Sequence, residues 1–276
     1  MDLLNYWQLR ERPFETIWDS RFFFSSRAHD EALNRLRYLA AEQSINIGLL
    51  TGEIGCGKTL TLAIFREQLD PARYCVACFD HVRFDFEDIV RGLLTVLDEP
   101  VPMEASRLVL WQTLGAALDR LEQSGRHCIA IFDEAQDFDI ETLRELKGLS
   151  NLNGSGRSPI TLIFTGQPEL QQHLATVPSL WQRIGLRFHL RALTREESDA
   201  YLTHRMRIAG HGDGYVFSEE ALSFFFWKSR GVPRELNRLA KLAIEHAWVS
   251  GQDQVAFEAV DAVYNDEAQH CLLTTL

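Results

Sequence analysis

Eight consecutive residues of this sequence have the types and spacing of a phosphate-binding loop. They read Gly-Glu-Ile-Gly-Cys-Gly-Lys-Thr and fit the pattern G-x-x-x-x-G-K-[ST]. Glycines let backbone N–H groups close around phosphate oxygens, and the amino end of a following helix adds partial positive charge. We expect Lys58 to reach the β- and γ-phosphates and Thr59 to bind Mg²⁺. The predicted cofactor is therefore ATP with Mg²⁺, held by Gly52, Glu53, Ile54, Gly55, Cys56, Gly57, Lys58, Thr59 and Leu60.

An acidic pair follows a second apolar segment. The residues Cys128 to Phe132 have the pattern of a buried strand, and Asp133 and Glu134 come directly after them. In a sequence with a phosphate-binding loop, this order is typical of a Walker B segment. We expect Asp133 to hold Mg²⁺ through its water shell and Glu134 to polarise the attacking water as a general base. The alternative is an acidic helix cap after a strand.

A third apolar strand, at 160–164, ends in Thr165-Gly166-Gln167-Pro168. A polar side chain at this point is suited to contact the γ-phosphate or the attacking water. We favour Gln167 for this role, with Thr165 as the second choice. The alternative is an ordinary turn before a helix.

Three arginines have positions that suit contact with the phosphates of a bound nucleotide. Arg183 and Arg187 precede the last expected strand, and arginine stabilises the charge that develops on a transferring phosphoryl group. Supplied by a neighbouring subunit, such an arginine would make hydrolysis depend on oligomerisation; we favour Arg183, and Arg187 is otherwise a surface residue. Arg234, in Gly-Val-Pro-Arg, is suited to fold onto bound phosphates, although the same residues also fit a plain helix start with proline first.

The elements that must position these residues alternate between strands and helices. We expect strands at 46–51, 74–79, 127–132, 159–165 and 186–190, separated by helices, and after Leu193 helices alone. Alternation of this kind predicts an α/β fold: a parallel five-stranded sheet covered on both faces, followed by an all-helical lid. The expected domains are an aromatic latch and helix at 1–44, a P-loop core at 45–192 and the helical lid at 193–276.

Composition limits the classes of function. Acidic residues outnumber basic ones by 39 to 28 among 276 residues, for a formal charge of −11, which argues against a surface that coats DNA but not against a local basic patch. No apolar run has the length of a membrane span, and the first residues lack the basic region of a signal peptide. The five cysteines lack disulfide-framework spacing. We therefore expect a cytoplasmic protein with no metal beyond Mg²⁺.

Together these residues resemble a known family. The pieces that carry the resemblance are the loop from Gly52 to Thr59, Asp133-Glu134, Thr165-Gly166-Gln167-Pro168-Glu169-Leu170, Gln182-Arg183-Ile184 and Gly231-Val232-Pro233-Arg234. The sequence resembles AAA+ ATPases of the ExeA/GspA type, which are close to the TniB, TnsC and MuB transposition ATPases. The resemblance implies ATP at a subunit interface of a homo-oligomeric ring or filament. It also implies a sensor 1 residue near Gln167, an arginine finger near Arg183 and a sensor 2 residue at Arg234.

The expected activity is hydrolysis of ATP to ADP and phosphate, and three uses of it stay open. One is an accessory role in secretion, pilus or other envelope assembly through an unidentified protein partner. Another is a DNA-bound regulator of transposition, which basic residues such as Arg83 and Arg157 would support. The third is a slow nucleotide-gated scaffold, against which the intact Asp133-Glu134 pair counts. ExeA proper continues into a membrane span and a periplasmic region that this sequence lacks, so we expect no envelope anchoring by this chain itself.

Overall fold

The computed structural model describes residues 2–15, 19–42, 44–80, 84–150, 152 and 158–273, with side chains up to residue 266. The chain divides into two compact units. We call them the sheet unit, His29–Ile54 with Thr61–Leu190, and the helical unit, Met1–Ala28 with Gly55–Leu60 and Arg191–Leu276. The basic residues Arg83 and Arg157 lie outside the described residues.

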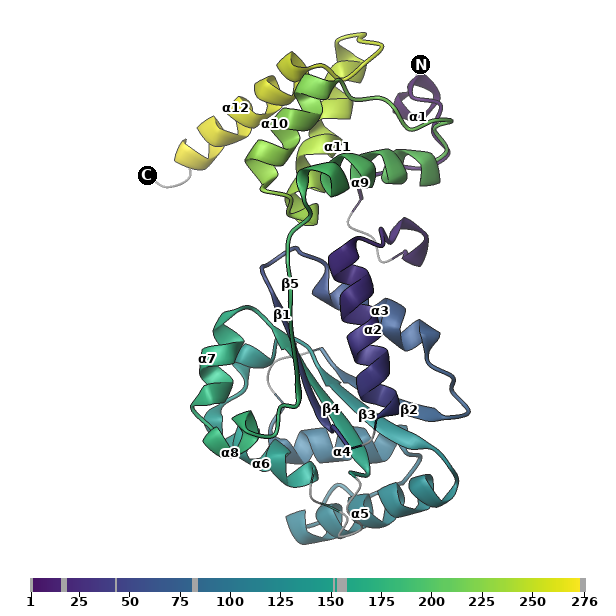
Figure 1. Ribbon diagram of the computed structural model, residues 1–276, viewed down its shortest axis with the longest axis vertical. Coiled ribbons are helices and arrows are strands. Elements are labelled where there is room, and N and C mark those ends of the chain that lie inside the picture. The colour runs from purple at the N-terminus through teal and green to yellow at the C-terminus, as the bar shows by residue number, and fades with distance from the viewer. Residues whose placement is uncertain are drawn as a thin grey trace. The chain divides into compact units, whose positions relative to one another are not determined.

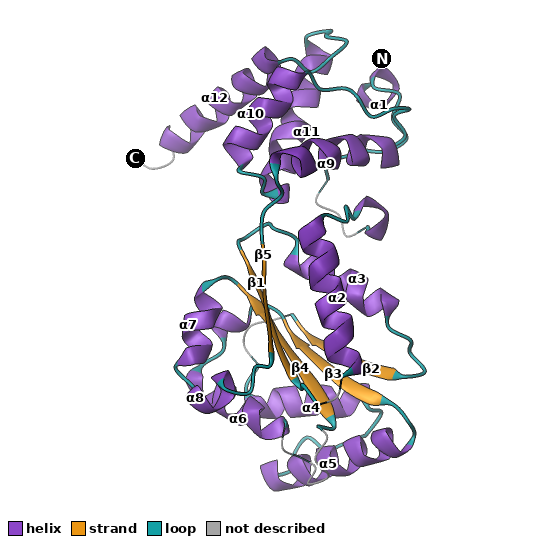
Figure 2. Ribbon diagram, in the orientation of Figure 1, coloured by secondary structure: helices purple, strands orange, loops and turns teal. Residues whose placement is uncertain are grey.

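The sheet unit contains a five-stranded parallel sheet, as the alternating pattern predicts (Figure 2). Its order is β2-β3-β4-β1-β5. The strands are β1 (Ile47–Gly52), β2 (Tyr74–Phe79), β3 (His127–Phe132), β4 (Ile160–Gly166) and β5 (Leu186–Leu190). Every residue of β1, β3 and β4 is buried, which requires that both faces of the sheet be covered.

Helices provide this cover (Figure 1). They are α2 (Arg27–Ala41), α3 (Lys58–Gln68), α4 (Phe86–Val96), α5 (Arg107–Gln123), α6 (Ile140–Leu149), α7 (Glu169–Ala175) and α8 (Pro178–Trp181), with the short 3₁₀ turn η2 (Ala135–Asp137). Helix α2 packs closely on β1, because a Cβ atom at Gly48 would lie 2.3 Å from Cδ2 of Leu39. Ile47 and Leu49, on the other face of β1, belong to the core that α4, α5 and α6 share.

Three phenylalanine rings cross the sheet near the carboxyl ends of its strands. Phe132 of β3 stacks between Phe79 of β2 and Phe164 of β4, with ring centroids 5.2 Å apart in both pairs. Phe138, just after η2, packs edge-on against Phe132 at 5.7 Å. Stacked and edge-on aromatic pairs add to the burial of their apolar area. This cluster fixes the point at which β3 ends and the acidic pair begins.

The helical unit contains α9 (Arg195–Ile208), α10 (Glu219–Ser229), α11 (Pro233–Val249) and α12 (Phe257–Leu273), with α1 (Leu3–Tyr6) and the 3₁₀ turn η1 (Ser20–Phe22). Thr194 and Glu197 form a capping box at the start of α9. In the apolar run Phe224 to Trp227, Phe225 is fully buried in the core of this unit. Trp227 is 66% exposed, so the run is only partly core.

The aromatic segment at the start of the chain belongs to the helical unit. Trp7 and Phe22 are buried in the same core as Phe225, and Nε1 of Trp7 donates a hydrogen bond to the carbonyl oxygen of Ile244 at 3.2 Å. The segment 1–44, which the sequence analysis treats as one piece, is therefore divided after Ala28. The expected boundary at 192/193 lies close to the observed one between Leu190 and Arg191.

A buried histidine makes the stability of the sheet unit depend on pH. His127 is 5% exposed, Nε2 lies 2.8 Å from Oγ1 of Thr161, and burial lowers its pKa from 6.5 to about 4. Between these values the unfolded chain binds a proton that the folded chain does not, so acidification favours unfolding. We expect His127 to lower the free energy of unfolding by about 2 kcal/mol between pH 7 and pH 5.

Urea unfolding at both pH values checks this expectation. The variant His127→Gln keeps a hydrogen-bonding side chain beside Thr161 but does not titrate in this range. Its loss of stability between pH 7 and pH 5 should be smaller than that of the parent by about 2 kcal/mol. An equal loss in both proteins would contradict the assignment.

Candidate functional site

The strand order brings the two motifs of the sequence to one edge of the sheet. Strand β4 lies between β1 and β3, with Thr51 beside Gly166 and Phe132 beside Phe164. Gly52 is the last residue of β1 and Asp133 directly follows β3, so both lie at the carboxyl edge. Two strand spacings separate them, about 10 Å. In open parallel sheets this edge is where ligands bind.

Asp133 is held from two sides within the sheet unit. It is only 8% exposed, and its Oδ1 accepts hydrogen bonds from the hydroxyl of Thr165 and from the backbone N–H of Glu134, the latter at 3.0 Å. Hydrogen bonds of this kind orient a carboxylate for a metal and are as important to a metal site as the ligands themselves. Thr165, the second choice for the residue at the end of β4, thus contacts the Walker B aspartate directly.

Glu134 has an unusual backbone conformation. Its φ of 50° and ψ of 40° are left-handed, which costs a residue other than glycine about 1 kcal/mol or more. Its Oε2 accepts a hydrogen bond from Nε2 of Gln136 at 2.8 Å. Strained backbone at a reactive position is typical of functional sites, because the surrounding structure has to impose it. The strain therefore agrees with a role for this carboxylate in the chemistry.

Gln167 is half-buried just before α7, and its backbone N–H contacts the side chain of Gln136. This N–H donates to Oε1 of Gln136 at 3.2 Å. The expected contact of the Gln167 side chain with nucleotide stays a prediction. Gln136 was not among the predicted site residues, although its place two residues after Glu134 was a usable signal.

Below the carboxyl edge, a polar network connects β1 to α7 and β5. Oγ1 of Thr51 accepts a hydrogen bond from Nε2 of Gln171 at 3.1 Å and lies 3.1 Å from Nδ1 of His189. Thr51 immediately precedes the phosphate-binding loop, so the network fixes the strand from which the loop departs. No sequence motif marks these residues, since their partners lie more than 100 positions away.

The phosphate-binding loop departs from β1 with the geometry that its glycines predict. A Cβ atom at Gly52 would lie 2.7 Å from the carbonyl oxygen of Leu190 in β5, so only glycine fits there. Gly55 and Gly57 have φ values of 84° and 95°, which other residues rarely adopt. Helix α3 then begins at Lys58, which is 5% exposed. The order strand, glycine loop and helix amino end is thus confirmed.

Within the helical unit, Arg234 lies against this loop. Its backbone N–H donates to the carbonyl oxygen of Gly55 at 3.3 Å, and a Cβ atom at Gly55 would lie 2.6 Å from Cβ of Arg234. Pro233 is the first residue of α11, as predicted. The structure therefore places the predicted sensor 2 arginine beside the loop, and its contact with phosphate stays a prediction.

Replacing Gly55 with alanine should weaken nucleotide binding by about tenfold or more, because the loop has to change its backbone to fit a methyl group. The measurement is a titration with a fluorescent ATP analogue. Gly125→Ala is the matched control, since Gly125 has a φ of 78° and no described atom lies within 4 Å of the added Cβ. Both variants should lose stability through backbone strain, but only Gly55→Ala should lose affinity. Equal affinities would contradict a role for the loop.

The two arginines before β5 differ in their surroundings. The guanidinium of Arg187 stacks on the ring of Trp181, with Cζ 3.6 Å from the centroid, and donates to the Trp181 carbonyl oxygen at 2.8 Å. Arg183 is exposed and donates to Oγ of Ser150 at 2.9 Å. Both arginines are exposed, and the stacking on Trp181 gives Arg187 a structural contact.

Arg183 lies near the amino ends of the strands, whereas Asp133 lies at their carboxyl ends. The backbone N–H of Gly185, two residues after it, donates to the carbonyl oxygen of Ile47 at the amino end of β1. β1 runs six residues from there to Gly52, about 16 Å at the usual rise per residue. Arg183 thus lies too far from Asp133 to contact the acidic pair of its own chain, and its expected role in trans stays a prediction.

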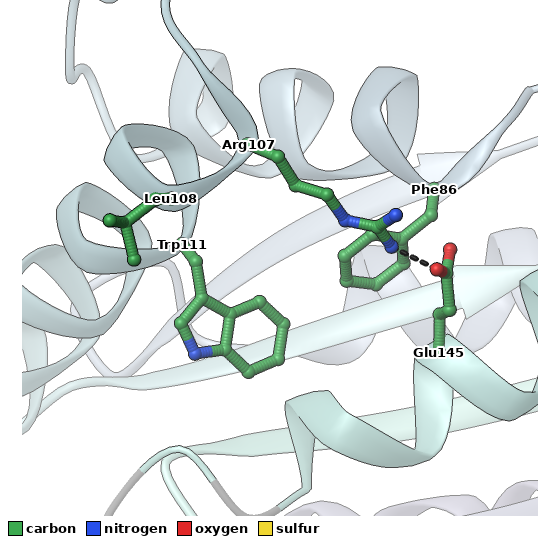
Figure 3. Close-up of a pocket in the computed structure, with 5 residues that line it drawn as sticks. All are labelled: Phe86, Arg107, Leu108, Trp111 and Glu145. Atoms are coloured by element: carbon green, nitrogen blue, oxygen red, sulfur yellow. Dashed lines mark hydrogen bonds and ion pairs between the residues drawn. The ribbon is translucent and has the colours of Figure 1, made fainter.

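A pocket of the sheet unit lies between α4, α5 and α6, away from the predicted site residues. It has a volume of about 390 Å³ and is lined by Phe86, Arg107, Leu108, Trp111 and Glu145 (Figure 3). Arg107 forms an ion pair with Glu145 and packs over the ring of Phe86. None of the predicted site residues lines it. Among the described residues, no three histidine, cysteine or acidic side chains group as a metal site, and no helix has the length and apolarity to span a membrane.

Residues 29–174, just over half of the chain, match the AAA domain family. The chain belongs to the AAA domain family. General secretion pathway protein A of Aeromonas hydrophila is 29% identical over 252 residues, which are 91% of this chain and 46% of that protein. This AAA domain chain therefore spans about half the length of the curated relative it matches. The resemblance to the ExeA/GspA type is confirmed at this distance.

Solved structures share the fold of this AAA domain protein. Cdc6p from Pyrobaculum aerophilum has a TM-score of 0.63 and 21% identity, covering 86% of this chain and 68% of that one. The ORC2 protein of Aeropyrum pernix, in its ADPNP–ADP complexes, has a TM-score of 0.67 and 18% identity, covering 91% and 70%. The RuvB branch migration motor of Thermotoga maritima has a TM-score of 0.57 and 17% identity, covering 84% of this chain and 66% of that one. The predicted AAA+ fold is confirmed.

Proposed function

We propose that this AAA domain protein binds Mg-ATP and hydrolyses it to ADP and phosphate. The observation that carries the proposal is the oriented acidic pair at the carboxyl edge of the sheet. Asp133 is fixed by Thr165, and Glu134 follows it in a strained backbone conformation, at the edge from which β1 enters the phosphate-binding loop. A carboxylate next to an oriented metal-binding aspartate is suited to accept a proton from an attacking water.

Each residue has a defined part in the proposed reaction. The backbone N–H groups of the loop and Lys58 bind phosphate oxygens, and Arg234 folds onto them. The Thr59 hydroxyl and the Asp133 carboxylate are oxygen donors of the kind that Mg²⁺ prefers, and the ion neutralises charge on the phosphates. Glu134 accepts a proton from the water that attacks the γ-phosphorus. Gln167 contacts the γ-phosphate or that water.

The proposed enzyme acts as a homo-oligomer, ring or filament. Arg183 lies at the edge of the sheet remote from its own Asp133 and donates to Ser150, so we assign it to the site of a neighbouring copy. An arginine supplied in trans stabilises the charge of the transferring phosphoryl group and makes turnover depend on assembly. Nucleotide binding and oligomerisation would then favour each other, because each completes the other's site.

For the use of this cycle, we favour an accessory role in secretion, pilus or other envelope assembly through a partner protein. The relative named General secretion pathway protein A supports this choice, since it matches 91% of the chain. The acidic balance of the sequence agrees with it, because phosphate backbones attract basic surfaces. A DNA-bound regulator of transposition and a slow nucleotide-gated scaffold are the competing outcomes of the test.

The test is the ATPase rate as a function of protein concentration, with and without double-stranded DNA, beside a size measurement in ATP. We expect a cooperative rise in specific activity with concentration, an ATP-dependent oligomer and no response to DNA. Turnover stimulated by DNA, with a large ATP-dependent assembly on it, would replace the envelope role with the transposition role. ATP-dependent assembly without measurable turnover would favour the scaffold.

A further inference from the structure

The side-chain amide of Gln136 connects two parts of the site. Its Nε2 donates to Oε2 of Glu134 at 2.8 Å, and its Oε1 accepts the backbone N–H of Gln167 at 3.2 Å. An ionised carboxylate only accepts hydrogen bonds and a backbone N–H only donates them, so one orientation of the amide satisfies both partners. The amide thus joins the proposed general base to the amino end of α7.

Gly166 makes room for this amide. A Cβ atom there would lie 2.2 Å from Oε1 of Gln136 and 2.9 Å from Cδ2 of Leu170. A methyl group at position 166 would therefore overlap the oxygen that Gln167 binds. Packing against Gln136 therefore requires glycine at position 166, although the two residues are 30 positions apart in the sequence.

The bond from Gln136 restricts the carboxylate that the reaction needs. A glutamate side chain has several rotamers, and a general base is effective only when its oxygen lies within hydrogen-bonding reach of the water. The left-handed backbone of Glu134 sets the direction in which the side chain leaves η2. The bond to Oε2 then selects one rotamer and leaves the second oxygen, Oε1, as the acceptor for a proton.

We propose that Gln136 is a positioning residue for ATP hydrolysis, which fixes the Glu134 carboxylate for proton transfer and ties its orientation to the start of α7. The inference rests on the proposed function, because it assigns Glu134 as the general base. It assigns Gln136 no contact with nucleotide. Removal of its amide should therefore lower the rate of the chemical step and leave ATP binding intact.

The first test is Gln136→Ala in the full chain, with kcat, KM for ATP and direct binding of a fluorescent ATP analogue. We expect kcat to fall between about 10-fold and 100-fold, as for other misplaced catalytic groups, with KM and affinity changed less than about twofold. Asp137→Asn is the matched control, because Asp137 is exposed and lies one residue further along the same turn. It should keep the kcat of the parent.

A double-mutant cycle with Gly166→Ala separates positioning from general damage. Alone, Gly166→Ala should lower kcat by a similar factor, since its methyl group displaces the amide. In a Gln136→Ala background the amide is already absent, so Gly166→Ala should lower kcat by less than about threefold further. Thermal midpoints of all variants show whether the fold is retained.

Three results would overturn the inference. If Gln136→Ala keeps the parental kcat while Glu134→Gln loses turnover, the positioning role is wrong and the proposed function stands. If the effects of Gln136→Ala and Gly166→Ala on kcat multiply in the double variant, and kcat falls in parallel with stability, the contact is structural. If neither Gln136→Ala nor Glu134→Gln alters turnover, the assignment of the general base is wrong as well.

Discussion

Glu134→Gln should lower ATP turnover by about 10²- to 10⁴-fold while ATP binding is retained, which is the usual contribution of a general base. Glutamine has the shape of glutamate but is a far weaker proton acceptor. The substitution leaves the buried strand β3 unchanged, and its amide oxygen accepts the hydrogen bond from Gln136 as the carboxylate does. The variant should therefore accumulate as an ATP-bound oligomer.

Three measurements check this result together: phosphate release at saturating ATP, binding of a fluorescent ATP analogue, and size in ATP. Asp137→Asn again provides the control, since it changes an exposed carboxylate on the same turn. Parental turnover in Glu134→Gln would show that another group accepts the proton. A loss of binding equal to the loss of turnover would instead assign Glu134 to the nucleotide pocket.

Arg183→Ala should lower turnover by about 10³-fold or more, the effect typical of an arginine supplied to a phosphoryl transfer. Its own chain's Asp133 lies at the other edge of the sheet, so the loss should arise at the site of a neighbouring copy. The fold should be little affected, because the side chain is exposed, and exposed polar contacts such as its hydrogen bond to Ser150 contribute little to stability. Steady-state turnover above the assembly concentration measures the effect.

Arg187→Ala is the matched control for Arg183. It removes an arginine four residues away that stacks on Trp181, so it should cost some stability but little turnover. Mixing Arg183→Ala with Glu134→Gln gives a second check. In mixed oligomers some interfaces regain one intact Glu134 and one intact Arg183, so turnover should exceed that of either variant alone. Unchanged turnover in Arg183→Ala with loss in Arg187→Ala would show that the finger is assigned to the wrong residue.

Local sequence signals predicted much of the fold. Every strand lies within one residue of its expected bounds, and β1, β3 and β4 are buried along their whole length. The caps of α6 and α9, at Asp139 and Thr194, are bonds to backbone only three residues away. Signals of this kind are visible in the sequence because the groups that interact are close neighbours in the chain.

The same reason explains which parts of the candidate site were predictable. The phosphate-binding loop is contiguous, so its glycines, Lys58 and Thr59 are recognisable together, and Asp133-Glu134 follows the strand that places it. The contact of Thr165 with Asp133 depends instead on β4 lying between β1 and β3. Strand order is a property of the whole sheet and leaves no mark on any single strand.

Tertiary structure alone decided three further features. The first aromatic residues, Trp7 among them, pack in the helical unit because burial has no preferred distance along the chain. Arg183 and Arg187 look alike in sequence, and only the ring of Trp181 separates their roles. Gln136 became part of the site when the fold brought Gly166 and Gln167 to its amide. The sequence thus determined the chemical groups and the local elements. The packing of the sheet decided which groups orient Asp133 and Glu134, because those contacts form between segments that only folding brings together.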